Sequence, residues 1–283
     1  MPARSLSDEY GDEHMIDIGC CGHTDTYLAI SQMGYDYVEL SARQLMELTE
    51  SEFSDFLSLY GKVGVPCRGF NDYCSEKYPI VGVGSNSELC QAYARKVCQR
   101  GIALGISTIG IGAPAARILP YHYSKEQADR DMADFLRYLC QITEKSGITI
   151  LLEAVHSGLC NYLTRTTDVL RLVQSLSLPN LKIVLDYYHA EVMGEDLYGF
   201  DYVMPYVNHL HISTDLKNHA RGFMREQDVP MMHKLLLNAA TAGYSGGISV
   251  EAEKKDLISY GADCAHWMRK ALLNINERRN CSI

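Results

Sequence analysis

Short apolar runs alternate along this chain with longer stretches in which apolar residues recur at helical spacing, and the alternation repeats about eight times. The runs are rich in isoleucine, valine and leucine with few polar interruptions. This pattern is typical of strands that are covered on both faces, as in a parallel sheet. We therefore predict eight strands, at residues 15–20, 35–40, 65–70, 106–111, 148–153, 181–186, 207–213 and 247–251.

The stretches between these runs carry helix signals. In residues 124–147, Ser124 is suited to cap a helix N-terminus, with Gln127 three residues further on, and Gly147 is a natural stop. Between them, apolar residues recur at intervals of three and four, which is the spacing of one helix face. The same periodicity occurs in residues 85–101 and 166–180.

Eight strand–helix units in 283 residues predict an α/β fold, a single (β/α)8 or TIM barrel. No proline- or serine-rich linker, charge block or low-complexity tract divides the chain. A doubly wound open sheet is the alternative, but residues 19–25 (GCCGHTD) match the glycine fingerprint of such folds poorly. We expect one barrel domain over residues 1–283, with 1–13 as a flexible lead and 276–283 as a C-terminal tail.

Composition and charge narrow the classes of function. A formal charge of −9 disfavours a nucleic-acid partner, because binding to a phosphate backbone needs a basic face. No apolar stretch approaches the roughly 20 residues that span a bilayer, and the N-terminus lacks the pattern of a signal peptide. We therefore expect a soluble, cytoplasmic protein. The ten cysteines form no CxxC pair, which indicates reduced thiols rather than a thiolate zinc site.

Four consecutive predicted strands end in a potential metal ligand. Glu153, Asp186 and Glu251 are the last residues of three of them, and His211 lies near the end of the fourth. The carboxyl ends of barrel strands share one rim, where the active sites of such barrels lie. Three carboxylates crowded there would raise one another's pKa unless a positive charge lay between them. The set therefore predicts a divalent cation, with Mn²⁺ or Mg²⁺ favoured by the oxygen-rich ligands and Co²⁺ also compatible.

These strand ends also carry a family resemblance. ITILLE (148–153), LKIVLDYYHAEVMGED (181–196), VNHLHIS (207–213) and GISVEAE (247–253) resemble the corresponding segments of the xylose isomerase-like barrel superfamily. Within it they are most similar to the group of D-tagatose 3-epimerase, D-psicose epimerase and hydroxypyruvate isomerase. MGYDYVEL (33–40) and IGAPAARILP (111–120) extend the similarity over most of the chain.

The resemblance implies a metal-dependent isomerase or epimerase with a small-molecule sugar as substrate and Mn²⁺ as the usual metal. It implies that Glu153, Asp186, His211 and Glu251 hold the metal and that His189 contacts the substrate. The chemistry fits, because a cation that chelates a sugar carbonyl and hydroxyl stabilises the enediolate formed when the adjacent carbon loses a proton. Glu153 and Glu251 could act as catalytic bases on opposite faces of that carbon.

Two stretches depart from the epimerase pattern. After the strand-five glutamate, residues 154–159 (AVHSGL) lack the expected arginine and second glutamate, and His156 stands where an asparagine would be. After His211 the usual arginine is replaced by Lys217, with Arg221 slightly further on, and lysine does not reproduce a planar two-pronged contact. These changes remain compatible with the metal chemistry, whereas the identity of the sugar is left open.

The sequence is therefore compatible with other functions as well. The same fold serves as the catalytic subunit of metal-dependent C-glycoside deglycosidases, lyases that act on 3-keto-glycosides with a small β-rich partner subunit. In that reading His156 could serve as an additional acid or base. A non-catalytic sugar-binding subunit is a further alternative, and the chain is compatible with a homo-oligomer. Further candidates for substrate contact on the predicted rim are Glu39, Asn71, Arg117, Lys217 and Arg221.

Overall fold

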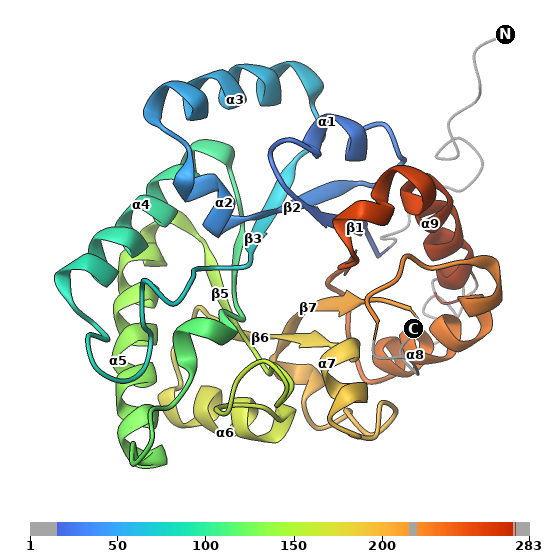
Figure 1. Ribbon diagram of the computed structural model, residues 1–283. Helices are drawn as coiled ribbons and strands as arrows, with labels where there is room; N and C mark the ends of the chain where they lie inside the picture. The colour runs from blue at the N-terminus through green and yellow to red at the C-terminus, as the bar shows by residue number, and fades with distance from the viewer. Residues whose placement is uncertain (1–15, 215–219, 274, 276–283) are drawn as a thin grey trace, which may run out of the picture.

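The computed structural model describes residues 16–214, 220–273 and 275, which form a closed barrel of eight parallel strands with helices around it (Figure 1). Each strand pairs with the next in sequence order, and the last pairs with the first. The strands are β1 (Ile18–Gly22), β2 (Tyr37–Ser41), β3 (Cys67–Asn71), β4 (Thr108–Ile111), β5 (Thr149–Glu153), β6 (Leu181–Asp186), β7 (Val207–Ile212) and β8 (Gly247–Val250). The single TIM barrel predicted from the sequence is confirmed.

Helices follow the strands and cover the outside of the barrel (Figure 1). They are α1 (Tyr27–Ile30), α2 (Ala42–Glu47), α3 (Glu50–Val63), α4 (Glu88–Leu104), α5 (Lys125–Thr143), α6 (Thr166–Leu176), α7 (Tyr187–Val192), α8 (Val229–Thr241) and α9 (Leu257–Leu272). The predicted lead 1–13 and tail 276–283 lie outside the described residues.

The predicted strands agree with the observed ones to within three residues at each end. The first strands begin later than predicted, because apolar residues that precede the paired segment are buried as well. Ile16, Tyr35 and Ile106 are such residues, each no more than 5% exposed. The apolar pattern thus reports burial, whereas the strand boundary is set by pairing with the neighbouring strands.

Helix α5 begins and ends near the residues that its sequence indicates. The Ser124 hydroxyl accepts a hydrogen bond from the backbone N–H of Gln127 at 3.1 Å and so caps the first turn. A short 3₁₀ turn follows Thr143, and Gly147 then takes a left-handed conformation with φ of 73°. Chain reversal at Gly147 leads directly into β5, which carries Glu153 at its carboxyl end.

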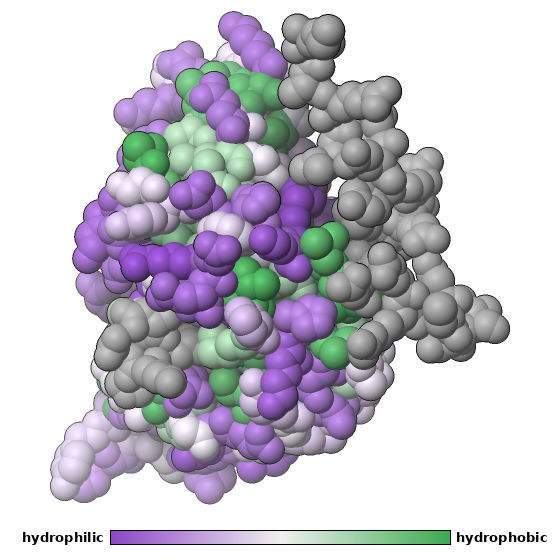
Figure 2. Space-filling model, turned by 90° about the vertical axis from the view of Figure 1, so that its right-hand side faces the viewer, coloured by the Kyte–Doolittle hydropathy of each residue, from purple (hydrophilic) through white to green (hydrophobic). Residues whose placement is uncertain are grey.

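The barrel interior and the layer between strands and helices form the apolar core. Fully buried members include Leu40, Phe70, Ile150 and Ile248, which lie on four different strands. Among the coloured residues of Figure 2, polar side chains predominate, with apolar ones in separate groups between them. Among the described residues, no helix is both long and apolar enough to cross a membrane.

Candidate metal centre and active site

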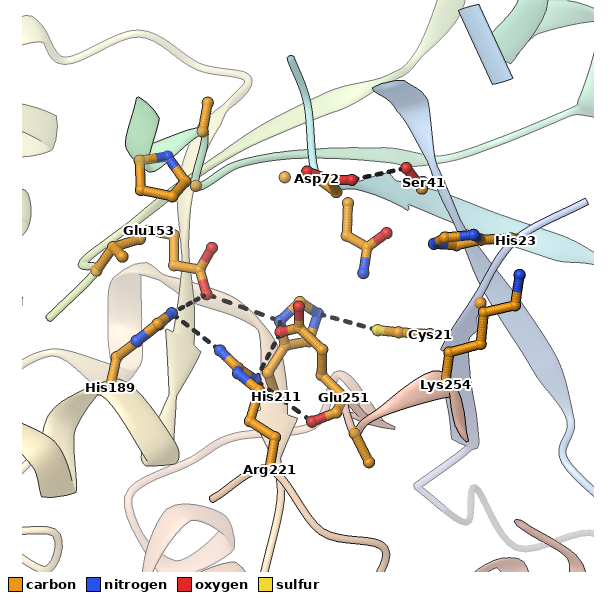
Figure 3. A pocket seen from close by; sticks show the side chains of 18 of the residues that line it. Cys21, His23, Ser41, Asp72, Glu153, His189, His211, Arg221, Glu251 and Lys254 are labelled. Carbon is orange, nitrogen blue, oxygen red and sulfur yellow. Dashed lines mark hydrogen bonds and ion pairs between the residues drawn. The ribbon is translucent and has the colours of Figure 1, made fainter. Parts of the chain in front are cut away.

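The carboxyl ends of the strands open into a cavity of about 280 Å³ (Figure 3). Glu153 from β5, His211 from β7 and Glu251 directly after β8 line it, together with His189 from α7. Asp186, the last residue of β6, lies against the same group and is 3% exposed. The strand-end residues that the sequence singled out therefore converge on one point of the rim.

The four predicted metal ligands lie close enough to share one ion. One potential ligand atom from each of Glu153, Asp186, His211 and Glu251 lies within 4.8 Å of the corresponding atoms of the other three. Two oxygen ligands of one Mg²⁺-type ion can be about 4.2 Å apart at most, so small side-chain rotations would close the set around a cation. The structure thus brings all four residues together.

The position of Glu153 depends on two neighbours in the loop after β4. Gly112 leaves the space that the carboxylate occupies, because a Cβ atom at Gly112 would lie 2.4 Å from Glu153 Oε2. Arg117, in the 3₁₀ turn Pro114–Arg117, is fully buried and donates from Nη1 to the backbone carbonyl of Glu153 at 2.8 Å. The end of β5 is therefore fixed from the side of β4.

The two carboxylate oxygens of Asp186 have different roles: one caps a helix, and the other lies in the ligand group. Oδ1 accepts a hydrogen bond of 2.7 Å from the backbone N–H of Tyr188 and so caps the N-terminus of α7. Oδ2 points toward the other ligands and lies 2.6 Å from Nη2 of Arg221. The helix cap thereby holds the carboxylate in the orientation that a metal ligand would need.

Two of the four ligand atoms are buried without a hydrogen bond. Glu153 Oε1 and His211 Nδ1 have no hydrogen-bond partner among the described residues. His211 Nδ1 lies 3.1 Å from Glu251 Oε2 and 3.9 Å from Glu153 Oε1, but neither approach has hydrogen-bond geometry. Buried polar atoms are rarely left unpaired, so these two mark a place where a ligand fits.

Arg221 holds the remaining two ligand atoms. Its guanidinium lies 2.6 Å from Asp186 Oδ2, 2.9 Å from Glu251 Oε2 and 2.9 Å from His189 Nε2. Burial alone would raise the pKa of Glu251, but the charges of Arg221 and His211 outweigh burial and hold that pKa well below its usual range. The predicted substrate contacts His189 and Arg221 therefore lie in direct contact with the ligand group.

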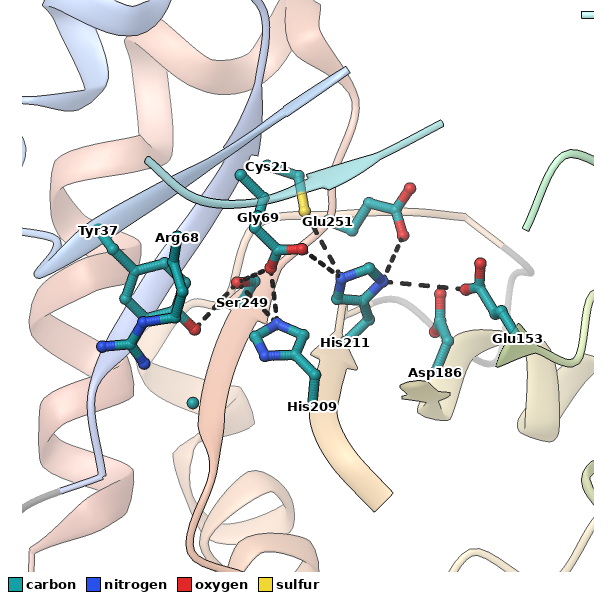
Figure 4. A network of polar contacts seen from close by, with 12 residues as sticks. Cys21, Tyr37, Arg68, Gly69, Glu153, Asp186, His209, His211, Ser249 and Glu251 are labelled. Carbon is teal, nitrogen blue, oxygen red and sulfur yellow. Dashed lines mark hydrogen bonds and ion pairs between the residues drawn. The ribbon is translucent and has the colours of Figure 1, made fainter. Parts of the chain in front are cut away.

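A buried polar network lies beneath His211, inside the barrel (Figure 4). Glu39 Oε2 is 3.4 Å from His211 Nε2, and Glu39 Oε1 is 2.6 Å from His209 Nε2. Ser249 also donates a hydrogen bond to Glu39. Burial alone would raise the pKa of Glu39, but the charges of His209 and His211 outweigh burial and hold that pKa well below its usual range. The imidazole of His211 thus meets Glu39 with one nitrogen and the cavity with the other.

The other predicted contacts differ in position. Asn71 lines the cavity, and its Oδ1 is buried without a hydrogen-bond partner in the described part of the chain. Glu39 and Arg117 do not line the cavity but support residues that do. His156 packs beside His189, with ring centroids 5.2 Å apart, and is not among the lining residues. Lys217 lies outside the described residues.

Several polar residues of the cavity were not among the sequence candidates: Cys21, His23, Ser41, Asp72 and Lys254. Cys21 and His23 lie at and just beyond the end of β1, and Cys21 Sγ is 3.9 Å from His211 Nε2. The rule that pointed to Glu153, a polar residue at the carboxyl end of a strand, would also have selected these two. This signal is weaker at a cysteine or histidine than at the acidic residues that end the later strands.

The barrel and the carboxylate–histidine cluster define a TIM-barrel protein with a group that could hold a divalent cation at the carboxyl-terminal rim of its strands. The chain belongs to the xylose isomerase-like TIM barrel family, whose model matches residues 28–271. The superfamily resemblance seen in the strand ends is thereby confirmed. No curated protein has significant sequence similarity to this chain.

Solved structures of similar fold share little sequence with this chain. A 3-keto-D-glucoside 4-epimerase from E. coli is 17% identical, with a TM-score of 0.71 over 90% of this chain and 99% of that one. A D-psicose 3-epimerase from Clostridium cellulolyticum H10, with D-tagatose, is 15% identical, with a TM-score of 0.73 over 91% and 99%. The IolI protein, with a bound zinc atom, is 16% identical, with a TM-score of 0.66 over 93% and 99%.

Proposed function

We propose that this protein is a divalent-metal-dependent sugar isomerase or epimerase that moves a proton next to a carbonyl group. The observation that carries the proposal is the convergence of Glu153, Asp186, His211 and Glu251, with Glu153 Oε1 and His211 Nδ1 buried and without a hydrogen bond among the described residues. Solved structures of similar fold include two named as sugar epimerases. Their names support a sugar or keto-sugar as the substrate class.

The residues fit a hard divalent cation. Three carboxylates and one imidazole form an oxygen-rich donor set, which favours Mn²⁺ or Mg²⁺ and admits Co²⁺. The zinc atom in the IolI structure makes Zn²⁺ the other metal to compare. A cation held there would supply Lewis-acid stabilisation of the negative charge that develops beside a carbonyl.

The chain itself supplies the bases. Glu153 and Glu251 approach the cavity from β5 and from the end of β8, so they reach a bound sugar from different directions (Figure 3). A carboxylate that uses one oxygen as a ligand keeps the second for proton transfer. Removal of a proton by one glutamate and return by the other inverts the carbon, which is epimerisation. Return to the neighbouring carbon gives isomerisation.

Hydrogen exchange tests the proposal directly. The protein, loaded in turn with Mn²⁺, Mg²⁺, Co²⁺ and Zn²⁺, would be incubated in deuterated water with D-fructose, D-psicose, D-tagatose and a 3-keto-glucoside. We expect deuterium to enter one of these sugars at the carbon next to the carbonyl, and a chelator to abolish the exchange. Tight sugar binding without exchange under any of these metals would instead indicate a non-catalytic sugar-binding subunit.

A second candidate is elimination from a 3-keto-glycoside. It is favoured by the similarity in fold to an enzyme named as acting on a 3-keto-D-glucoside. A base would take the proton from C2, next to the C3 ketone, and the bond from C1 to the aglycone would break. In the same assay this reaction would release the aglycone, whereas epimerisation would leave the glycosidic bond intact. A small partner subunit belongs to this second candidate, and its addition would then raise the rate of release.

Gly112→Ala is expected to lower turnover by about 100-fold, because displacing a reacting group by about 1 Å can cost that much. The added Cβ would lie 2.4 Å from Glu153 Oε2 and would push the carboxylate out of the ligand group. The backbone of Gly112 is not left-handed, so its conformation is open to alanine and the expected effect comes from the contact with Glu153. Gly61→Ala, with nothing within 4 Å of the new atom, is the matched control. Turnover and circular dichroism of both variants check the expectation, and unchanged turnover in Gly112→Ala would contradict it.

A further inference from the structure

Arg221 occupies the side of the ligand group where two carboxylates meet. Its guanidinium bridges Asp186 Oδ2 and Glu251 Oε2, and a third contact of 2.9 Å joins it to His189 Nε2. The backbone holds Arg221 in this place. The neighbouring Gly222 forms an antiparallel bridge with Thr214, which lies just beyond β7, and the Arg221 carbonyl accepts a hydrogen bond from the N–H of Glu253 at 3.0 Å.

The ligand atoms thus fall into two pairs. Glu153 Oε1 and His211 Nδ1 make no hydrogen bond among the described residues, while Asp186 Oδ2 and Glu251 Oε2 are each engaged by the positive charge of Arg221. An oxygen that donates its lone pair to a cation at metal-ligand distance cannot keep a guanidinium nitrogen in the same direction. A metal ion that uses all four atoms therefore competes with Arg221 for two of them.

We propose that Arg221 is a built-in counter-cation of the metal centre, which a divalent ion displaces from Asp186 and Glu251 when it binds. This inference rests on the proposed metal-dependent function. In the absence of metal, Arg221 offsets the repulsion among the three carboxylates and keeps the centre assembled. The free energy of this ion pairing then opposes metal binding, so the affinity for metal is lower than the four ligands alone would give.

Arg221 also makes two contacts that do not involve the four ligand atoms. The Arg221 guanidinium carbon lies 4.4 Å from the ring centroid of Tyr188, and Nη1 lies 3.3 Å from the backbone carbonyl of Glu251. Both contacts are available when the carboxylates turn to a metal, and both keep the guanidinium in the cavity. A displaced Arg221 would therefore face the oxygens of a bound substrate with a planar, two-pronged donor.

Metal affinity is the direct test, because it does not depend on catalysis. Binding of Mn²⁺ would be measured by the electron paramagnetic resonance signal of the free ion, without sugar, for the unaltered protein and for Arg221→Ala and Arg221→Met. We expect both variants to bind Mn²⁺ about 10- to 100-fold more tightly, the size of a typical coupling between two ligands. Lys254→Ala is the matched control, because Lys254 also lines the cavity but pairs with Asp25 at 2.6 Å.

The possible results separate this inference from the proposed function. Equal or weaker Mn²⁺ binding by both Arg221 variants, with clear binding by the unaltered protein, would overturn the role of Arg221 alone. Absence of binding by all proteins, for Mg²⁺, Co²⁺ and Zn²⁺ as well, would overturn the metal centre itself. If both variants are unfolded without metal, a Mn²⁺-bound crystal structure of the unaltered protein decides. Arg221 must then lie beyond hydrogen-bond distance of Asp186 Oδ2, and retention of that contact beside the metal would contradict the inference.

Discussion

Glu153→Gln and Glu251→Gln are each expected to lower the rate of sugar epimerisation by about 10²- to 10⁴-fold, the contribution of a positioned acid or base. Glutamine keeps the shape of the side chain and one oxygen that can bind a metal, but its amide cannot take up a proton. The two glutamates reach the cavity from β5 and from the end of β8. Turnover of the most active sugar from the exchange panel would be measured for both variants.

The position of the deuterium label tests more directly whether the two glutamates act on opposite faces of the sugar. Suppose that each glutamate serves one face of the sugar carbon. A variant that lacks one glutamate can then still remove the proton from the epimer whose C–H bond points toward the remaining glutamate. In deuterated water, Glu153→Gln and Glu251→Gln should therefore introduce label into opposite epimers, without converting one into the other. Measuring the metal affinity of both variants shows whether a lower rate comes from loss of the base or from loss of the bound ion. Label in the same epimer for both, or a full rate in either, would contradict the two-base arrangement.

The fold and the four strand-end residues could be predicted from the sequence because both follow from local rules. Apolar runs mark buried strands, and parallel strands of a barrel end at one rim. Glu153, Asp186 and Glu251 are the charged residues that end such runs, so their meeting was implied once the barrel was inferred. Spacing along the chain carries this information without any knowledge of side-chain contacts.

The contacts of Arg221 and Glu39 could not be predicted in the same way. Arg221 reaches the centre because Thr214 and Gly222 pair across a loop, and no periodic pattern reports such a bridge. Glu39 ends no apolar run, since Leu40 and Ser41 continue β2 beyond it. Its side chain consequently lies one level below the rim, against His209 and His211 of a strand far away in sequence. Which partner it meets depends on the register around the closed barrel.

The placement of Glu39 leads to a second large expected effect, on the proposed metal centre rather than on proton transfer. If Nε2 of His211 carries the ring proton and donates it to Glu39, then Nδ1 presents its lone pair to the cavity. Carboxylates that orient metal-binding histidines in this way are worth about 10- to 100-fold in metal affinity. We therefore expect Glu39→Gln to weaken Mn²⁺ binding by about that factor, because its amide group can present a donor to His211 and disturb the orientation of the ring.

A merely structural role for Glu39 would produce a different result. Removing one partner of a buried ion pair costs about 3–5 kcal/mol, so Glu39→Gln should also lower the unfolding temperature. His209→Gln is the matched control, because it breaks the 2.6 Å contact with Glu39 but leaves the contact between Glu39 and His211. We expect both variants to be destabilised and only Glu39→Gln to lose Mn²⁺ affinity. Equal loss of affinity in both would mean that the buried network supports the barrel and does not orient His211.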